Sequence, residues 1–171
     1  LLYPGDRSAD VLRHVRDFMT TAPEHVAAGI LLLYGFEDDA VPAKLQGRLM
    51  VAVWAWHLGP VERADDELAE LRGFGPPAAD LIAQGAYADL QCAMDDPPGF
   101  RNYFTAEHID HLTDAAISTV CDHATRLPRG PGWTFLVPWG GAVSRLGDGT
   151  PLTNRSANWI VHPGAFWTDA T

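Results

Sequence analysis

Two apolar runs of strand length stand near each other in the first third of the chain. Residues 26–34 and 48–56 are rich in β-branched, aliphatic and aromatic side chains. Residues 35–47 between them contain an acidic turn and Pro42. Runs of this length and composition are typical of buried strands, and short connections favour antiparallel pairing. The sequence therefore predicts a sheet that contains this antiparallel pair.

Helices are predicted before and after that pair in the sequence. Apolar residues recur at helical spacing over residues 11–22 and 113–124, and each stretch ends before a proline. A third helix is predicted over residues 60–72, with Val61, Ala64, Leu68 and Leu71 on its buried face. Cys121 falls on the apolar stripe of the 113–124 helix, so it is predicted to be a core thiol.

The rest of the chain predicts shorter elements between glycine and proline turns. These are a short helix over residues 87–94 and strands at residues 80–83, 100–104, 133–137, 142–146 and 158–167. Short strands interrupted by helices favour an α+β fold, an antiparallel β-sheet with helices packed on one face. We expect the other face, which is rich in large apolar residues, to be covered by a second domain or a ligand.

Composition limits the classes of partner. The 171 residues are 47% hydrophobic and 20% charged, which suits one soluble domain over residues 1–171. A formal net charge of −10 disfavours nucleic acid and anionic membrane surfaces. The longest apolar run, residues 26–34, is too short to span a bilayer. Cys92 and Cys121 have no paired spacing, so we expect a reducing, cytoplasmic environment.

Motif searches give little direct chemistry. The sequence has no Gly-x-Ser-x-Gly elbow and no glycine-rich phosphate loop, which disfavours a hydrolase and a nucleotide cradle within these residues. His108 and His111 have a spacing that could supply metal ligands, but polar residues are common beside a helix start. We interpret this segment as a solvated helix entry, and no metal site is predicted.

Aromatic residues gather in the predicted late strands. A flat, conjugated ligand would suit such a wall, and packing between sheet and helices is the alternative. Trp54 and Trp56 are expected on one face of their strand, where core packing or a domain interface explains them. The late aromatic and histidine residues are Trp133, Phe135, Trp139, Trp159, His162, Phe166 and Trp167.

An ordered set of phrases resembles a known family. The phrases include LYP at 2–4, FGPPAAD at 74–80, YADLQ at 87–91, RNY at 101–103 and WGGAV at 139–143. Together they are similar to the substrate-binding region of FAD-linked oxidases of the berberine bridge enzyme type. The resemblance covers essentially the whole chain. It implies the substrate domain of the vanillyl-alcohol-oxidase-like flavoprotein fold.

The resemblance implies an FAD-dependent oxidoreductase that oxidises an alcohol or amine group of a small molecule by hydride transfer to flavin. Most FAD contacts are expected in a flavin-binding domain outside this sequence, so the chain is expected to be a fragment that is inactive alone. His162 is the implied catalytic residue, as acceptor of a substrate proton. Tyr103, Phe135 and Trp139, aromatic residues of the predicted late strands and their neighbours, are the candidate substrate-binding residues of this hypothesis.

Some residues depart from the family pattern. Val137 replaces a glutamate that is common before the Gly140-Gly141 pair, and Thr105 stands where many relatives have lysine. Pro163 follows His162 and is expected to distort that strand or confine it to a sheet edge. These departures keep a second hypothesis open: a non-catalytic small-molecule-binding or interaction domain of α+β type.

Overall fold

The computed structural model describes residues 1–92, 95, 98–145 and 151–168. The strands are β1 (Leu2–Pro4), β2 (Val26–Tyr34), β3 (Leu49–His57), β4 (Arg101–Phe104), β5 (Glu107–Ile109), β6 (Gly132–Pro138) and β7 (Trp159–Trp167). The α-helices are α1 (Ser8–Met19), α2 (Ala64–Glu67), α3 (Ala69–Arg72), α4 (Tyr87–Cys92), α5 (Asp114–Ala124) and α6 (Ala142–Arg145). Two short 3-10 helices, η1 (Gly5–Arg7) and η2 (Val61–Arg63), precede α1 and α2.

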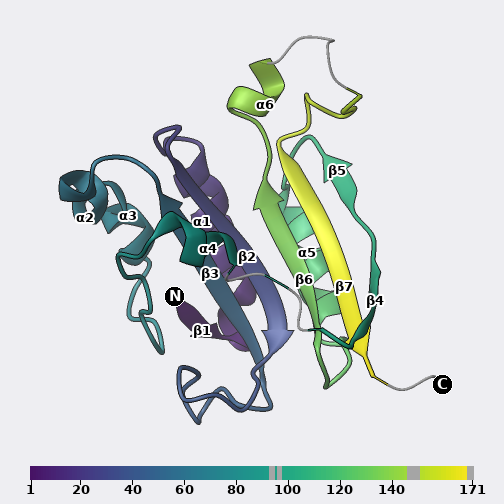
Figure 1. Ribbon diagram of the computed structural model, residues 1–171. Helices are drawn as coiled ribbons and strands as arrows, with labels where there is room; N and C mark the ends of the chain where they lie inside the picture. The colour runs from purple at the N-terminus through teal and green to yellow at the C-terminus, as the bar shows by residue number, and fades with distance from the viewer. Residues whose placement is uncertain (93–94, 96–97, 146–150, 169–171) are drawn as a thin grey trace.

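The described strands form one antiparallel sheet in the order β1-β3-β2-β6-β7-β4, and β5 also pairs with β7 (Figure 1). The predicted pairing of the two early apolar runs is confirmed: Val26 lies opposite His57, and Tyr34 lies opposite Leu49. β2 also pairs with β6, which joins the early hairpin to the late strands. No described helix is both long and apolar enough to cross a lipid bilayer.

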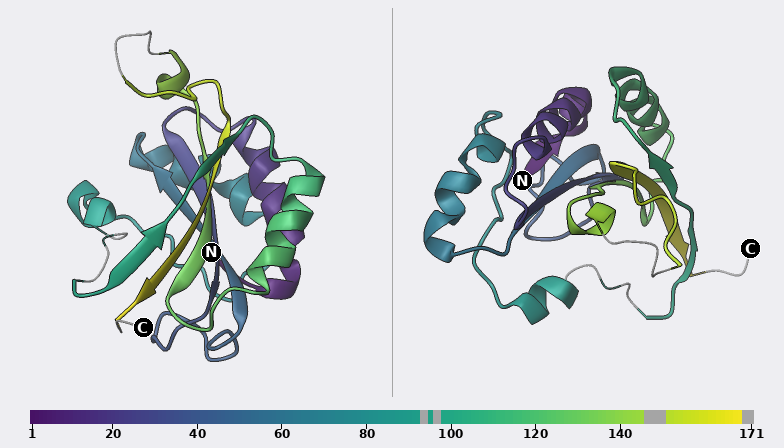
Figure 2. Two further views of the ribbon diagram at one scale, coloured as in Figure 1. Left: turned by 90° about the vertical axis from the view of Figure 1, so that its right-hand side faces the viewer. Right: turned by 90° about the horizontal axis from the view of Figure 1, so that it is seen from above.

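One face of the sheet is covered by α1 and α5, which lie side by side on it (Figure 2). The Thr113 hydroxyl caps α5 by accepting the backbone N–H of Ala116. The predicted fold class, an antiparallel sheet with helices packed on one face, is confirmed. Fully buried aliphatic and aromatic side chains fill the space between helices and sheet: Val11, Leu12, Val15, Phe18, Ala28, Ile30, Leu32, Val51, Ile117, Ala124 and Leu136.

The prediction of one continuous helix over residues 60–72 is wrong. The segment consists of η2, α2 and α3, with a break at Leu68. Leu68 and Leu71 are buried as expected, but Val61 is half exposed. Glu62, Asp66 and Glu70 follow one another at four-residue spacing, and this like-charge repulsion disfavours one continuous helix.

Three strand and helix assignments are corrected in the second half. Residues 80–83 form no strand, because the Asp80 carboxylate accepts the backbone N–H of Ile82 and holds the chain in a turn. Glu107–Ile109 is strand β5 rather than a helix entry. Residues 142–145 form α6 rather than a strand, after Gly140 and Gly141 turn the chain with positive φ. Leu146, predicted in the same strand, lies outside the described residues.

Pro163 does not confine β7 to an edge, and the strand runs through it without interruption. It pairs with Thr134 on β6, while its carbonyl oxygen faces the other side and accepts the N–H of Thr105 at 3.3 Å. Thr105 lies between β4 and β5, where the neighbouring ladder is interrupted. No acceptor on the neighbouring strand therefore needs the N–H group that Pro163 lacks. This explains how an interior strand tolerates a proline.

Candidate functional site

The face of the sheet opposite α1 and α5 carries a continuous group of ring-bearing side chains. Strand partners in register point to the same face, so Phe135 opposite His162, and Trp133 opposite Gly164, lie on one surface. Neighbouring Leu136 and Thr134 point to the helix side and are buried there. We call this group the aromatic wall: Trp54, Trp56, Phe104, Trp133, Phe135, His162 and Phe166.

The rings of the aromatic wall come from four strands, β3, β6, β7 and β4, and touch one another across the sheet. Their centroids lie 4.7 Å apart for Trp54 and Trp56, and 5.6 Å apart for Trp54 and Phe135. Trp133 lies 6.0 Å from Phe135 and 4.9 Å from His162. These separations are those of offset or edge-to-face aromatic pairs. The wall is therefore a packed surface, and most of its rings are only half-buried.

Two glycines let the rings lie close to the backbone. A Cβ at Gly29 would meet the indole of Trp54 at 2.7 Å. A Cβ at Gly164 would meet Phe104 at 2.7 Å and Trp133 at 2.9 Å. Both distances are too short for a real side chain. Because Gly29 and Gly164 have no side chain, the rings of the aromatic wall can pack directly on the backbone there.

His162 is the titratable residue of the wall. Its ring lies edge-on against Trp133 and Phe104. Burial against these rings lowers the pKa of His162 from its ordinary value, because the charged form loses hydration. Within the described part of the chain, no side-chain hydrogen bond reaches its ring nitrogens. His162 is therefore held neutral at neutral pH, with a ring nitrogen able to accept a proton.

The structure separates the four residues that the sequence analysis proposes for the site. Phe135 and His162 lie side by side in the wall. Tyr103 pairs with Ala165, so it points to the opposite face of the sheet and is largely exposed. Trp139 lies beyond the end of β6, where its ring meets His108 edge-on at 5.6 Å. The four residues thus occupy three separate environments.

Trp139 also lines an open hollow at the end of the sheet, of about 840 Å³. The end of α1, the segment 110–113 and the segment 138–145 enclose it. The indole Nε1 of Trp139 is buried and has no hydrogen-bond acceptor among the described residues. A buried donor of this kind is suited to a ligand or a covering chain that brings an oxygen atom.

A second polar cluster lies on the helix side of the sheet, away from the wall. The Nε2 atoms of His25 and His57 lie 2.6 and 2.7 Å from the same oxygen, Oε2, of Glu67. In the part of the chain that the structure describes, this is the group of His, Cys, Asp or Glu side chains that could hold a metal ion. Among the described residues, His108 and His111 do not join such a group.

Sequence reasoning missed this cluster although a signal was present. His25 precedes β2 and His57 ends β3, and the predicted antiparallel pairing brings these two ends together. Glu67 could not be placed, because its position depends on how the broken helical segment returns to the sheet. The aromatic wall was partly foreseen, but Phe104 and the two early tryptophans were not assigned to it.

No known family model and no curated protein sequence matches the chain. The fold nevertheless matches part of the chain in solved structures of berberine bridge enzyme and of similar proteins. One is 6-hydroxy-D-nicotine oxidase from Arthrobacter nicotinovorans, with a TM-score of 0.69 and 20% identity over 99% of this chain. Berberine bridge enzyme from Eschscholzia californica has a TM-score of 0.67 and 12% identity over 99%.

A third similar structure is a berberine bridge enzyme-like protein from Arabidopsis thaliana, with a TM-score of 0.64 and 14% identity over 98% of this chain. The chain spans 37%, 35% and 36% of the lengths of these three proteins. The fold implied by the family resemblance is therefore confirmed.

Proposed function

We propose that the chain is the substrate-binding domain of an FAD-dependent oxidoreductase that oxidises an alcohol or amine group of a small molecule. The observation that carries the proposal is the aromatic wall with His162 embedded in it, on the sheet face that α1 and α5 leave uncovered. Such a surface binds a flat, apolar substrate or covers a flat ring system. The matched fold supports this assignment.

The residues present fit FAD as a group that stacks on them and is held elsewhere. The rings of the wall offer contacts to the face of a planar ring system, whereas the net charge of −10 and the absent glycine-rich loop do not suit a pyrophosphate. We therefore place the phosphate contacts in a separate flavin-binding domain. FAD, when bound, supplies a hydride acceptor.

His162 is proposed as the general base. A neutral imidazole beside the substrate accepts the hydroxyl or ammonium proton as the carbon–hydrogen bond is broken. Phe135 lies opposite His162 in register and is proposed to position the substrate against it. The rings of Trp133 and Phe104 partly shield the imidazole from water, which lowers its pKa and favours the unprotonated form.

The test is flavin reduction in the full-length protein that contains this chain. We expect the purified protein to show flavin absorbance that bleaches when a panel of small alcohols and amines is added without oxygen. With a substrate found in this way, His162→Gln should slow the bleaching by roughly 10²–10⁴-fold. His123→Gln is the matched control, because His123 is exposed on α5 and should leave the rate unchanged.

A non-catalytic small-molecule-binding domain is the second candidate. One observation favours it: among the described residues no side-chain hydrogen bond or ion pair orients the His162 ring, which packs edge-on against Phe104 and Trp133, whereas a catalytic base is usually oriented by a polar partner. A full-length protein that lacks flavin but binds planar ligands with quenching of tryptophan fluorescence would support this candidate. Flavin bleaching that is insensitive to His162→Gln would remove only the catalytic role of His162.

A further inference from the structure

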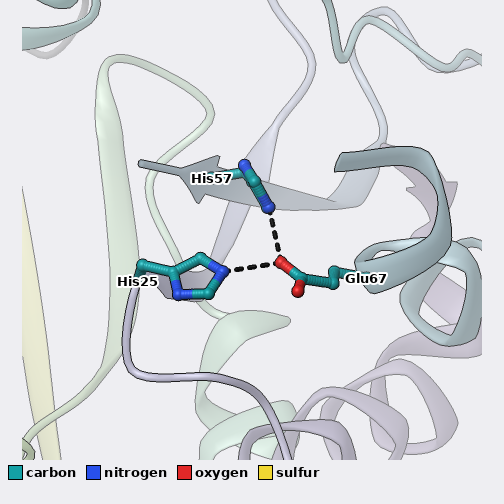
Figure 3. A group of neighbouring side chains, drawn as sticks. All are labelled: His25, His57 and Glu67. Atoms are coloured by element: carbon teal, nitrogen blue, oxygen red, sulfur yellow. Dashed lines mark hydrogen bonds and ion pairs between the residues drawn. The ribbon is translucent and has the colours of Figure 1, made fainter. Parts of the chain in front are cut away.

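Three side chains from separate elements meet at the open end of the β2–β3 hairpin (Figure 3). His25 lies just before β2, His57 is the last residue of β3, and Glu67 is the last residue of α2. Because His57 alternates with Trp56, it points to the helix side of the sheet. The cluster is thus separated from the aromatic wall by the thickness of the sheet, and the proposed oxidation does not use it.

The ligand atoms of these side chains are already close together. The two Nε2 atoms and one carboxylate oxygen lie within 4.8 Å of one another, and both imidazoles point at the same oxygen. Zinc binds imidazole nitrogen and carboxylate oxygen at about 2.0–2.2 Å in tetrahedral geometry. Ligand atoms around such an ion are roughly 3.3–3.5 Å apart, so each histidine–glutamate contact must widen by less than ~1 Å.

The surrounding backbone holds the histidines in this arrangement. The carbonyl oxygen of His25 accepts the N–H of Leu58 at 2.9 Å, which ties the two hairpin ends together. Gly59 packs against both rings: a Cβ there would meet His25 at 2.5 Å and His57 at 3.1 Å. The side chains of His57 and Glu67 are only 6% and 10% exposed. The donor atoms are therefore fixed by packing before any ion binds.

The charges also suit a cation. Hydrogen bonds from His25 and His57, with the Arg63 guanidinium nearby, hold the pKa of Glu67 below its usual range, so the carboxylate is ionised at neutral pH. Arg63 Nη2 lies 2.6 Å from the other carboxylate oxygen, Oε1, and leaves Oε2 turned to the histidines. Asp65 and Asp66 add negative charge on the exposed side of α2.

We propose that His25, His57 and Glu67 form a site for a divalent transition-metal ion, with Zn²⁺ as the metal that this donor set suits best. Two neutral imidazoles and one carboxylate supply three ligands, and water completes the tetrahedron. The ion takes the place of the hydrogen-bonding protons on Nε2, and each imidazole stays neutral by carrying its proton on Nδ1 instead. Since the ligands come from the hairpin and from α2, the ion fixes the broken helical segment to the sheet.

The experiment uses the full-length protein after treatment with a chelator. Zn²⁺ is titrated in competition with a chromogenic chelator, and Co²⁺ is titrated separately to record the visible bands of a four-coordinate site. We expect His25→Asn, His57→Asn and Glu67→Gln each to weaken Zn²⁺ binding at least tenfold and to remove the Co²⁺ bands. Glu62→Gln and His123→Asn are exposed, matched controls that should change neither readout.

Circular dichroism checks that each variant is folded. If loss of a buried partner unfolds the Glu67 or His57 variant, His25→Asn decides, because the His25 side chain is 32% exposed and its loss disturbs the packing least. Two results would overturn the proposal. One is the absence of Zn²⁺ binding, which would leave Glu67 as a hydrogen-bond acceptor only. The other is Zn²⁺ binding that all three variants retain.

Discussion

The two faces of the sheet are built from alternate residues of the same strands, yet they differ in kind. On the helix side, Ile30, Leu32 and Leu136 are fully buried aliphatic residues beneath α1 and α5. On the other side, Phe135 and His162 are rings that remain partly exposed. The helix side is a fully buried hydrophobic core. The aromatic wall has a core-like composition, but the described residues leave its rings partly exposed, and a ligand or a second domain would provide a cover.

The largest expected difference between the two faces is in stability. Leu136→Ala removes a fully buried side chain and should lower the free energy of unfolding by about 2–5 kcal/mol. Phe135→Ala, its neighbour on the wall, should cost less than about 2 kcal/mol because the ring is already partly exposed. Urea unfolding of both variants measures this. Equal losses would mean that the wall is as closed as the core.

The next largest effect on stability is expected at Gly164, on which the rings of the aromatic wall pack. Gly164→Ala would push a Cβ into the Phe104 and Trp133 rings and should destabilise the protein by about 1–3 kcal/mol. Gly130→Ala is the matched control, since nothing lies within 4 Å of a Cβ there. The shift in the melting temperature compares the two variants. A Gly164→Ala protein as stable as the control would show that the rings move apart freely.

A smaller effect is expected from the titration of His162. Burial lowers its folded-state pKa below 6.5, so the unfolded chain binds the proton more readily. That contribution to stability is complete above pH 6.5 and is lost as the pH falls from 6.5 toward the lowered folded value. His162→Asn should lack this slope. NMR titration of the His162 ring gives the midpoint directly, and a midpoint above 6.5 would contradict the expectation.

The smallest effect is expected at Tyr103, which the β4–β7 register places on the other side of the sheet from Phe135 and His162. Tyr103→Ala should change the free energy of unfolding by no more than about 0.5 kcal/mol, because the side chain is largely exposed. Ligand affinity should also stay within about twofold, measured by tryptophan quenching. A large loss of affinity would place the ligand around the edge strand β4 rather than on the wall.

The spacing of apolar residues predicted the long helices and strands correctly. It failed where side chains bond to the local backbone or where a strand is defined only by its pairing. The α1 and α5 stripes and the β2–β3 pair could be predicted, because many apolar residues repeat in phase. Residues 80–83 could not, since the Asp80 side chain satisfies the local backbone and replaces strand pairing. The three-residue strand β5 is defined by its pairing with β7, which no local pattern of Glu107–Ile109 reveals.

The candidate site shows the same division. Phe135 and His162 could be proposed from the late strands, but the face of a strand is set by register, and a shift of one residue exchanges the faces. That is why Tyr103 was grouped with residues on the opposite side. The sequence alone could not predict the cluster of His25, His57 and Glu67. Glu67 reaches it through a helical segment whose break could not be foreseen.

The strand order has a consequence for how the chain folds during synthesis. β2 and β3 are adjacent in sequence and can pair early, but the other edge of β2 waits for β6: Leu33 pairs with Trp133, and Ile30 pairs with Leu136. Until those residues leave the ribosome, a long apolar edge has no partner. Such edges are prone to pair with other chains, so nascent chains of this protein should depend on chaperones and fold slowly.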